Sequence, residues 1–121
     1  MSKSHFDRLD AYRLAIEFVS LTRPLVLRLR KTDLPMADQL QRAVISIPCN
    51  VAEGAGEFSL GDKARFYRYA LRSATECVAV LDASHAIGAL TPDAHERMRD
   101  VGIRLVKMLT RLVMSATPKK P

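Results

Sequence analysis

Apolar residues recur at steps of three and four along most of this chain, a period that predicts α-helices rather than strands. Short breaks that contain proline, glycine or capping residues interrupt the pattern and divide it into four segments. The predicted helices span residues 8–28, 35–53, 60–87 and 92–114, and residues 115–121 are expected to form a frayed basic tail. Long helices joined by short loops are typical of an antiparallel up-down-up-down four-helix bundle, so the sequence predicts an all-α fold.

Local signals set the expected ends of the first two helices. Asp7 is expected to cap the first helix, in which Pro24 would either introduce a kink or end the helix early. Pro35 suits the first turn of the second helix. Gly54 and Gly56 are expected to end that helix with a left-handed turn, because glycine adopts positive φ without steric cost.

The ends of the last two helices carry similar signals. Ser59 and Asp62 have the spacing of a capping box at the start of the third helix, and Gly88 is expected to close it. Thr91 followed by Pro92 is typical of a cap and a first helical position, so the fourth helix is expected to begin there.

The first helix has a wider apolar face than a single packing partner requires. Its apolar residues form two adjoining stripes: Leu14, Phe18, Leu21 and Leu25, beside Leu9, Tyr12, Ile16 and Val19. A helix in an isolated bundle buries one such stripe, so the second stripe indicates contact with another copy or partner. The fourth helix has one continuous heptad seam, formed by Ala94, Met98, Val101, Leu105, Met108 and Leu112.

The second helix carries a polar stripe beside its apolar one, with Pro48 in the middle of both. Its members follow one another at steps of three and four: Gln39, Arg42, Ser46, Asn50 and Glu53. Ser73 and Glu76 of the third helix are expected near the same level. We hypothesise that Arg42 pairs with Glu76 while Ser46 and Asn50 bridge backbone and side chains between the two helices. In the alternative interpretation, this stripe simply faces water.

The net charge of +6 lies mostly in the second half of the 121-residue chain. Residues 61–121 contain eleven lysines and arginines against six acidic residues. A basic surface of this kind favours an acidic partner such as RNA or DNA, although the same charge also serves solubility. The length fits one domain, residues 1–121, and no apolar run is long enough to span a membrane.

Two helices carry candidate phosphate-binding residues. The candidates are Arg97, Arg104, Lys107 and Arg111 in the fourth helix and Arg65, Arg68 and Arg72 in the third. Basic stripes on helices can follow a nucleic-acid backbone, but they carry no sign of base-specific recognition. The alternative is a solvated face with pairs within the helix, such as Asp100–Arg104.

No pattern in the chain indicates an enzyme, a metal site or a cofactor. His5, His85 and His95 are scattered and have no metal-ligand spacing with Cys49 and Cys77. Both cysteines are expected to be buried free thiols in a cytoplasmic protein, since they lie among small and apolar residues.

The spaced residues of the second and third helices together resemble a known family. The matching positions are Gln39, Arg42, Ala43, Ser46, Ile47, Asn50, Ala52, Glu53 and Gly54, followed by Ser59, Phe66, Ala70, Ser73 and Glu76. They are similar to the signature of four-helix bundle proteins encoded by intervening sequences of bacterial 23S rRNA genes. Pro24 and Gln41 depart from that signature, and Gln41 stands where relatives often have a basic residue.

The resemblance implies a non-enzymatic accessory protein without an established catalytic set. A related branch, the accessory variability determinant of diversity-generating retroelements, forms a basic pentameric barrel that engages reverse transcriptase and nucleic acid. By similarity, this chain is expected to form a homopentameric ring or barrel that associates with RNA. The alternative function is a protein–protein interaction scaffold whose basic surface is incidental.

Overall fold

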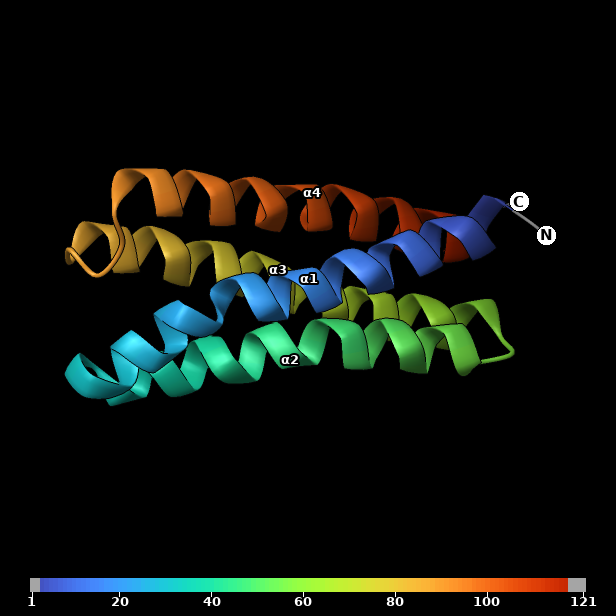
Figure 1. Cartoon of the computed structure of the whole chain (residues 1–121). Helices are drawn as coiled ribbons and strands as arrows, with labels where there is room; N and C mark the ends of the chain where they lie inside the picture. The colour runs from blue at the N-terminus through green and yellow to red at the C-terminus, as the bar shows by residue number, and fades with distance from the viewer. Residues whose placement is uncertain (1–2, 118–121) are drawn as a thin grey trace.

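The computed structural model describes residues 3–117, with side chains from Asp7 onward, and contains four helices and no strand in that range. The helices are α1 (Lys3–Thr32), α2 (Leu34–Gly56), α3 (Leu60–Ala86) and α4 (Pro92–Ala116). They lie alongside one another as a bundle (Figure 1), which confirms the all-α four-helix fold predicted from the apolar spacing.

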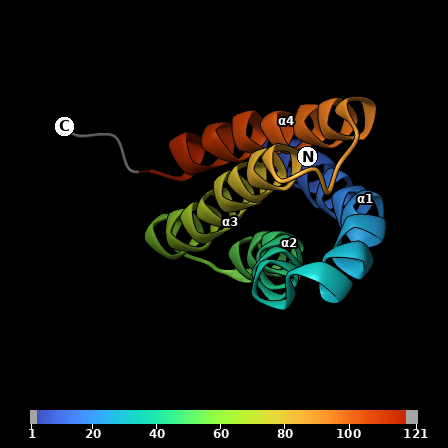
Figure 2. The same ribbon diagram turned by 90° about the vertical axis from the view of Figure 1, so that its left-hand side faces the viewer.

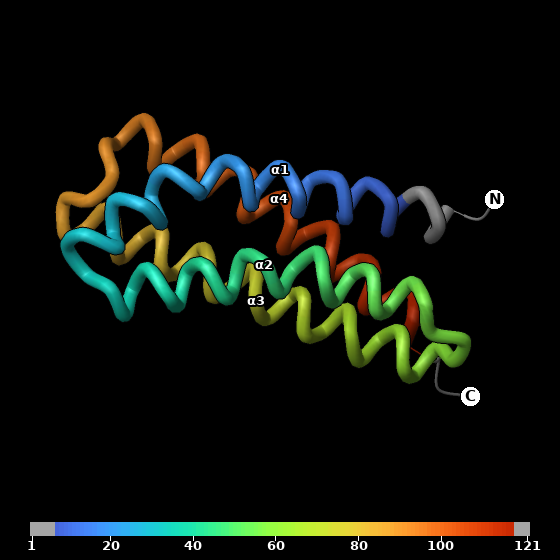
Figure 3. Tube along the Cα trace, turned by 60° about the horizontal axis from the view of Figure 1, so that its bottom comes forward, coloured from blue at the N-terminus to red at the C-terminus, as the bar shows by residue number. Residues whose placement is uncertain are grey.

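Each helix packs against two neighbours around a closed ring: α1 on α2, α2 on α3, α3 on α4, and α4 on α1. Figure 2 shows this arrangement from near one end of the bundle. The α1–α2 and α3–α4 connections lie at one end, and the α2–α3 connection lies at the other (Figures 1 and 3).

The core takes one stripe from each helix. Its largest fully buried side chains are Phe18, Leu25 and Leu29 of α1; Leu40, Ile47 and Val51 of α2; Leu81 of α3; and Leu105, Leu109 and Leu112 of α4. The second stripe of α1 remains at the surface, where Tyr12 is 39% and Ile16 is 46% exposed. On α3 the buried aromatic residue is Tyr67, whereas Tyr69 is exposed.

Helix α1 is longer than predicted at both ends. It begins at Lys3, so Asp7 lies inside the helix and does not cap it. It also continues through Pro24 to Thr32, because packing of Leu25, Val26 and Leu29 in the core supports the turns after the proline.

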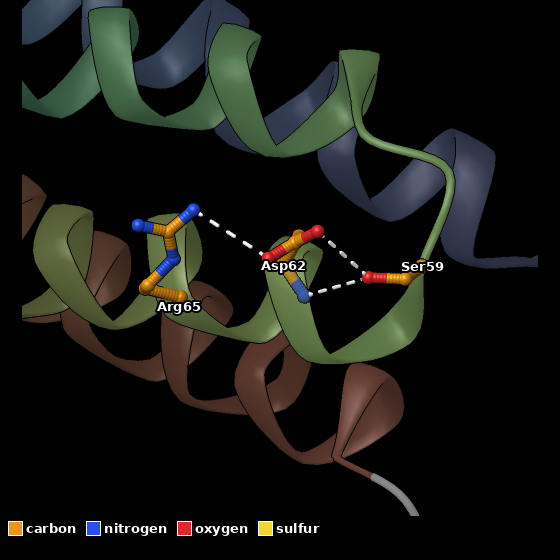
Figure 4. Close-up of polar contacts among 3 residues, drawn as sticks. All are labelled: Ser59, Asp62 and Arg65. Atoms are coloured by element: carbon orange, nitrogen blue, oxygen red, sulfur yellow. Dashed lines mark hydrogen bonds and ion pairs between the residues drawn. The ribbon is translucent and has the colours of Figure 1, made fainter.

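The caps of α3 and α4 agree with the sequence signals. The Ser59 hydroxyl accepts a hydrogen bond from the Asp62 backbone N–H and donates one to the Asp62 carboxylate (Figure 4). Thr91 accepts from the Ala94 N–H at the start of α4, and Gly88 has the positive φ of 82° after α3. Helix α4 includes Ser115 and Ala116, which were predicted to belong to the tail; residues 118–121 lie outside the described range.

Gly54 serves a different purpose from the predicted C-cap. Helix α2 runs to Gly56, its C-cap residue Glu57 is extended, and neither glycine has positive φ. A Cβ atom on Gly54 would lie 2.5 Å from Cε1 of the buried Tyr67 ring. The absence of a side chain at position 54 therefore allows α2 and the Tyr67 ring to approach each other closely.

Replacing Gly54 with alanine should destabilise the bundle by about 1–3 kcal/mol, because the new methyl group overpacks against Tyr67. Urea denaturation would measure the loss. Gly56→Ala is the matched control, since nothing lies within 4 Å of a Cβ at that position. Equal unfolding free energies for the two variants would contradict the steric explanation.

A polar cluster joins α3 to α4 near their shared connection. Asp82 Oδ1 lies 2.8 Å from His95 Nε2 and 3.1 Å from Arg99 Nε, and the His95 ring stacks on His85. The hydrogen bond from His95, followed by that from Arg99, holds the pKa of Asp82 below its usual value of 3.8.

The ionised form of Asp82 therefore stabilises the fold above its ordinary pKa, and this contribution disappears as the pH falls through the lower folded-state pKa. Asp82→Asn should reduce the unfolding free energy at neutral pH, and the deficit should shrink below pH 3.8. Denaturation across this pH range would measure it. A loss of unfolding free energy that does not change with pH would contradict the charge-dependent contribution. An equal loss in the control variant Asp100→Asn would contradict it as well.

Candidate binding surfaces

A polar pocket lies between α2 and α3, where the sequence predicted a polar seam. Its volume is about 280 Å³, and it is lined by Gln39, Arg42, Ala43, Ser46, Ser73 and Glu76. Steps of seven place Gln39 and Ser46 on the side of α2 that faces α3. Glu53, seven residues after Ser46, continues this row toward the end of the helix, and both Arg42 and Glu53 are exposed.

Of the two residues predicted to bridge the helices, Ser46 contacts α3, whereas the hydrogen bonds of Asn50 stay within α2. Ser73 Oγ and Ser46 Oγ lie 2.8 Å apart, and Ser73 is buried. Asn50 Nδ2 donates to the Ser46 backbone carbonyl at 2.9 Å and to Ser46 Oγ at 2.8 Å. The small polar residues of the seam are therefore paired rather than simply solvated.

The expected Arg42–Glu76 ion pair does not form. Gln39 Nε2 instead donates to Glu76 Oε1 at 3.1 Å, because Gln39 is seven residues from Ser46 and shares its side of α2, whereas Arg42 lines the pocket from the adjacent row. Arg42 forms no ion pair with a carboxylate among the described residues. Glu53 does not line the pocket, so the predicted seam contributes Gln39, Arg42, Ser46, Ser73 and Glu76 to its walls.

Three of the candidate basic residues of α4, Arg97, Arg104 and Arg111, lie on its α1 side. Arg97 lines a groove of about 380 Å³ together with Pro24 and Arg28 of α1. Arg104 and Arg111 follow Arg97 at intervals of seven and share its side of the helix. On the opposite side of α4, His95 and Arg99 contact Asp82 of α3.

The candidates on α4 are not neutralised by contacting carboxylates. Arg97, Arg104, Lys107 and Arg111 are all exposed and form no ion pair within the described part of the chain. The Asp100–Arg104 pair of the alternative interpretation is not formed.

The candidates on α3 form a separate set. Arg65, Arg68 and Arg72 are exposed on the surface of α3. Arg65 forms an ion pair with Asp62 at 3.5 Å (Figure 4) and lies over the Phe66 ring. Because Arg97, Arg104 and Arg111 face away from α3, the two sets do not combine into one continuous stripe.

A third surface, the apolar face, lies over the groove between α1 and α2. A hollow of about 310 Å³ there is lined by Tyr12, Ile16, Val19, Ile45, Pro48, Cys49 and Ala52. A smaller hollow extends it and is lined by Arg8, Leu9, Tyr12, Val51, Ala52 and Ala55. The second apolar stripe of α1 indicated the α1 half of this face. The α2 half was not predicted, because Ile45 and Cys49 belong to neither the apolar nor the polar stripe identified on the second helix.

The two cysteines differ in their environments. Cys77 is buried, and burial raises the pKa of its thiol to about 12. Cys49 is exposed on the apolar face, contrary to the expectation that both thiols are buried, because the second apolar stripe of α1 is left uncovered.

Among the side chains that the structure describes, from Asp7 to Thr117, no group of three or more histidine, cysteine or acidic residues is arranged to hold a metal ion. Within the same range, no helix has the length and apolar character needed to cross a bilayer.

Comparison with known proteins agrees with the residue pattern of α2 and α3. No curated protein matches the chain significantly. A crystal structure of a protein of unknown function from the S23 ribosomal protein family of Bacteroides thetaiotaomicron superposes with a TM-score of 0.83 at 20% identity. The match covers 89% of this chain and 98% of that one, and it establishes a shared fold. Residues 7–111 match the 23S rRNA-intervening sequence protein family, and the chain therefore belongs to that family.

Proposed function

We propose that this protein is a non-enzymatic, nucleic-acid-associated accessory protein that binds RNA through the basic side of α4. The observation that carries the proposal is the row of Arg97, Arg104, Lys107 and Arg111, exposed and without ion pairs among the described residues. Arginine suits phosphate because its planar guanidinium donates two parallel hydrogen bonds to the phosphate oxygens.

The overall charge supports a polyanionic partner. The net charge is +6 and the isoelectric point is about 9.7, so a nucleic-acid backbone is attracted over a distance of roughly one Debye length. Neutralising phosphates releases counterions, which favours binding at low salt. The α3 arginines supply a second, weaker contact surface, since Arg65 is already engaged with Asp62.

We propose that the functional unit is a homo-oligomer of antiparallel up-down-up-down bundles, with five copies in a ring as the family resemblance implies. The loops at alternate ends of the bundle support the antiparallel order (Figure 3). The apolar face supports self-association, since Ile16 and Ile45 are 46% and 39% exposed there. A ring with an odd number of copies requires a heterologous interface, so this face would meet a different surface of the next copy.

The proposal places the protein in the bacterial cytoplasm, where the thiols of Cys49 and Cys77 would stay reduced. The second candidate function is a protein–protein interaction scaffold. The apolar face favours it, because exposed apolar surface rimmed by polar residues is typical of protein docking sites.

Reversing the charges of Arg104, Lys107 and Arg111 to glutamate should weaken RNA binding and flatten its salt dependence. Loss of three phosphate contacts should make the negative slope of log K against log salt shallower, by about 2 for a single strand and by about 2.7 for duplex DNA. Fluorescence anisotropy with a structured RNA and with duplex DNA across a salt series would measure both quantities.

The matched control carries the same change of charge on α1, at Arg23, Arg30 and Lys31, which are exposed. Equal losses of RNA affinity in the two triple variants would show that the effect comes from net charge and not from the basic side of α4. No binding by the wild-type protein at low salt would refute the RNA proposal and favour the scaffold.

Ile16→Glu together with Ile45→Glu should shift the protein from an oligomer to smaller species, because each charge would be buried at the interface. Light scattering coupled to size exclusion would measure the mass. Met114→Glu is the control, since Met114 is 71% exposed on α4, away from the apolar face. A monomeric wild-type protein, or a double variant with the wild-type mass, would contradict assembly through this face.

A further inference from the structure

We infer that the polar pocket between α2 and α3 binds a small zwitterion of the free amino acid class, with its carboxylate at Arg42 and its ammonium group at Glu76. This site is independent of the proposed RNA surface. It rests on the pocket's uncommitted hydrogen-bonding groups and on its balance of charge.

The paired serines leave one donor without an acceptor. Ser46 Oγ accepts a hydrogen bond from Asn50 Nδ2, whose role as donor is established by its second bond to the Ser46 backbone carbonyl. Ser46 and Ser73 share one further hydrogen bond, which uses only one of their two hydroxyl protons. The other proton has no acceptor among the described residues, so the pair presents an O–H donor at the pocket.

Arg42 adds a cationic donor one helical turn away. Its side chain lines the pocket and forms no hydrogen bond or ion pair with any described residue. Positions four residues apart are separated by a rise of about 6 Å along the helix, so a guanidinium and a hydroxyl at these two positions suit the oxygens of one carboxylate.

The opposite part of the pocket supplies acceptors. The amide nitrogen of Gln39 donates to Glu76 Oε1, which leaves the Gln39 side-chain carbonyl oxygen and Glu76 Oε2 without a hydrogen-bond partner among the described residues. Together they suit an ammonium group, which has three protons to donate. The hydrogen bond to Gln39 also holds the Glu76 carboxylate in place before a ligand arrives.

The charge balance selects the class of ligand. A polyanion such as RNA would meet the Glu76 carboxylate, and a simple cation would meet the Arg42 guanidinium, so both are disfavoured here. A molecule with one charge of each sign satisfies both groups. The volume of about 280 Å³ admits a small polar molecule, and the site lies on two packed helices that keep its groups fixed.

The test uses the full-length protein and the common free amino acids as probes, first by thermal shift and then by calorimetric titration. Each amino acid that binds is compared with its N-acetyl derivative, which lacks the ammonium group, and with its amide, which lacks the carboxylate. Each capped form should bind at least about tenfold more weakly, because it loses a charge-assisted hydrogen bond.

Arg42→Gln should abolish the preference for the carboxylate over the amide, and Glu76→Gln should abolish the preference for the free ammonium group over its acetylated form. Both substitutions preserve hydrogen bonding and leave the Ser46–Ser73 contact intact. Arg13→Gln, an exposed change on α1 outside the pocket and outside the proposed RNA surfaces, should bind like the wild type.

Absence of any binding amino acid at millimolar concentration would overturn the inference. Binding that survives unchanged in Arg42→Gln and Glu76→Gln would also overturn it, since the ligand would then occupy another place. Neither result bears on the RNA titration, which depends on residues of α4.

Discussion

The close contact between α2 and α3 is the constraint on which the other surfaces depend. Gly54 lets α2 approach the Tyr67 ring, and the hydroxyls of Ser46 and Ser73 meet two turns further along. Lys63 Nζ closes the end of the same interface by donating to the carbonyls of Gly54 and Ala55. These contacts are short and directional, so they permit one register between the helices, whereas apolar packing alone tolerates several.

That register has consequences on both sides of α2. Toward α3 it aligns Gln39 with Glu76 and leaves Arg42 at the mouth of a polar pocket. Toward α1 it leaves Ile45 and Cys49 beside the exposed stripe of α1, which creates the apolar face. One helix thus separates a surface suited to a small polar ligand from one suited to another protein copy, because its three sides carry different residue types.

The basic side of α4 is separated from both of these surfaces. Its position next to α1 follows from the contacts of His95 and Arg99 with Asp82, which turn the other side of α4 toward α3. Protein assembly through the apolar face and phosphate binding through α4 therefore need not compete for the same area. In an assembled ring, the α4 rows of several copies would add their attraction for one nucleic-acid chain.

The sequence by itself determined the four helices, the Ser59 and Thr91 caps and most residues of the polar seam, because these depend on periodicity and on side chains a few positions apart. It also placed the chain in its family through the spaced residues of α2 and α3. Only the tertiary structure decided that Gln39 rather than Arg42 contacts Glu76. It also decided that Gly54 makes room for the Tyr67 ring and does not form the C-cap of α2. It alone showed that α1 continues through Pro24 and that Cys49 is exposed. These outcomes depend on how the helices are rotated and how closely they approach, which residue spacing within one helix does not specify.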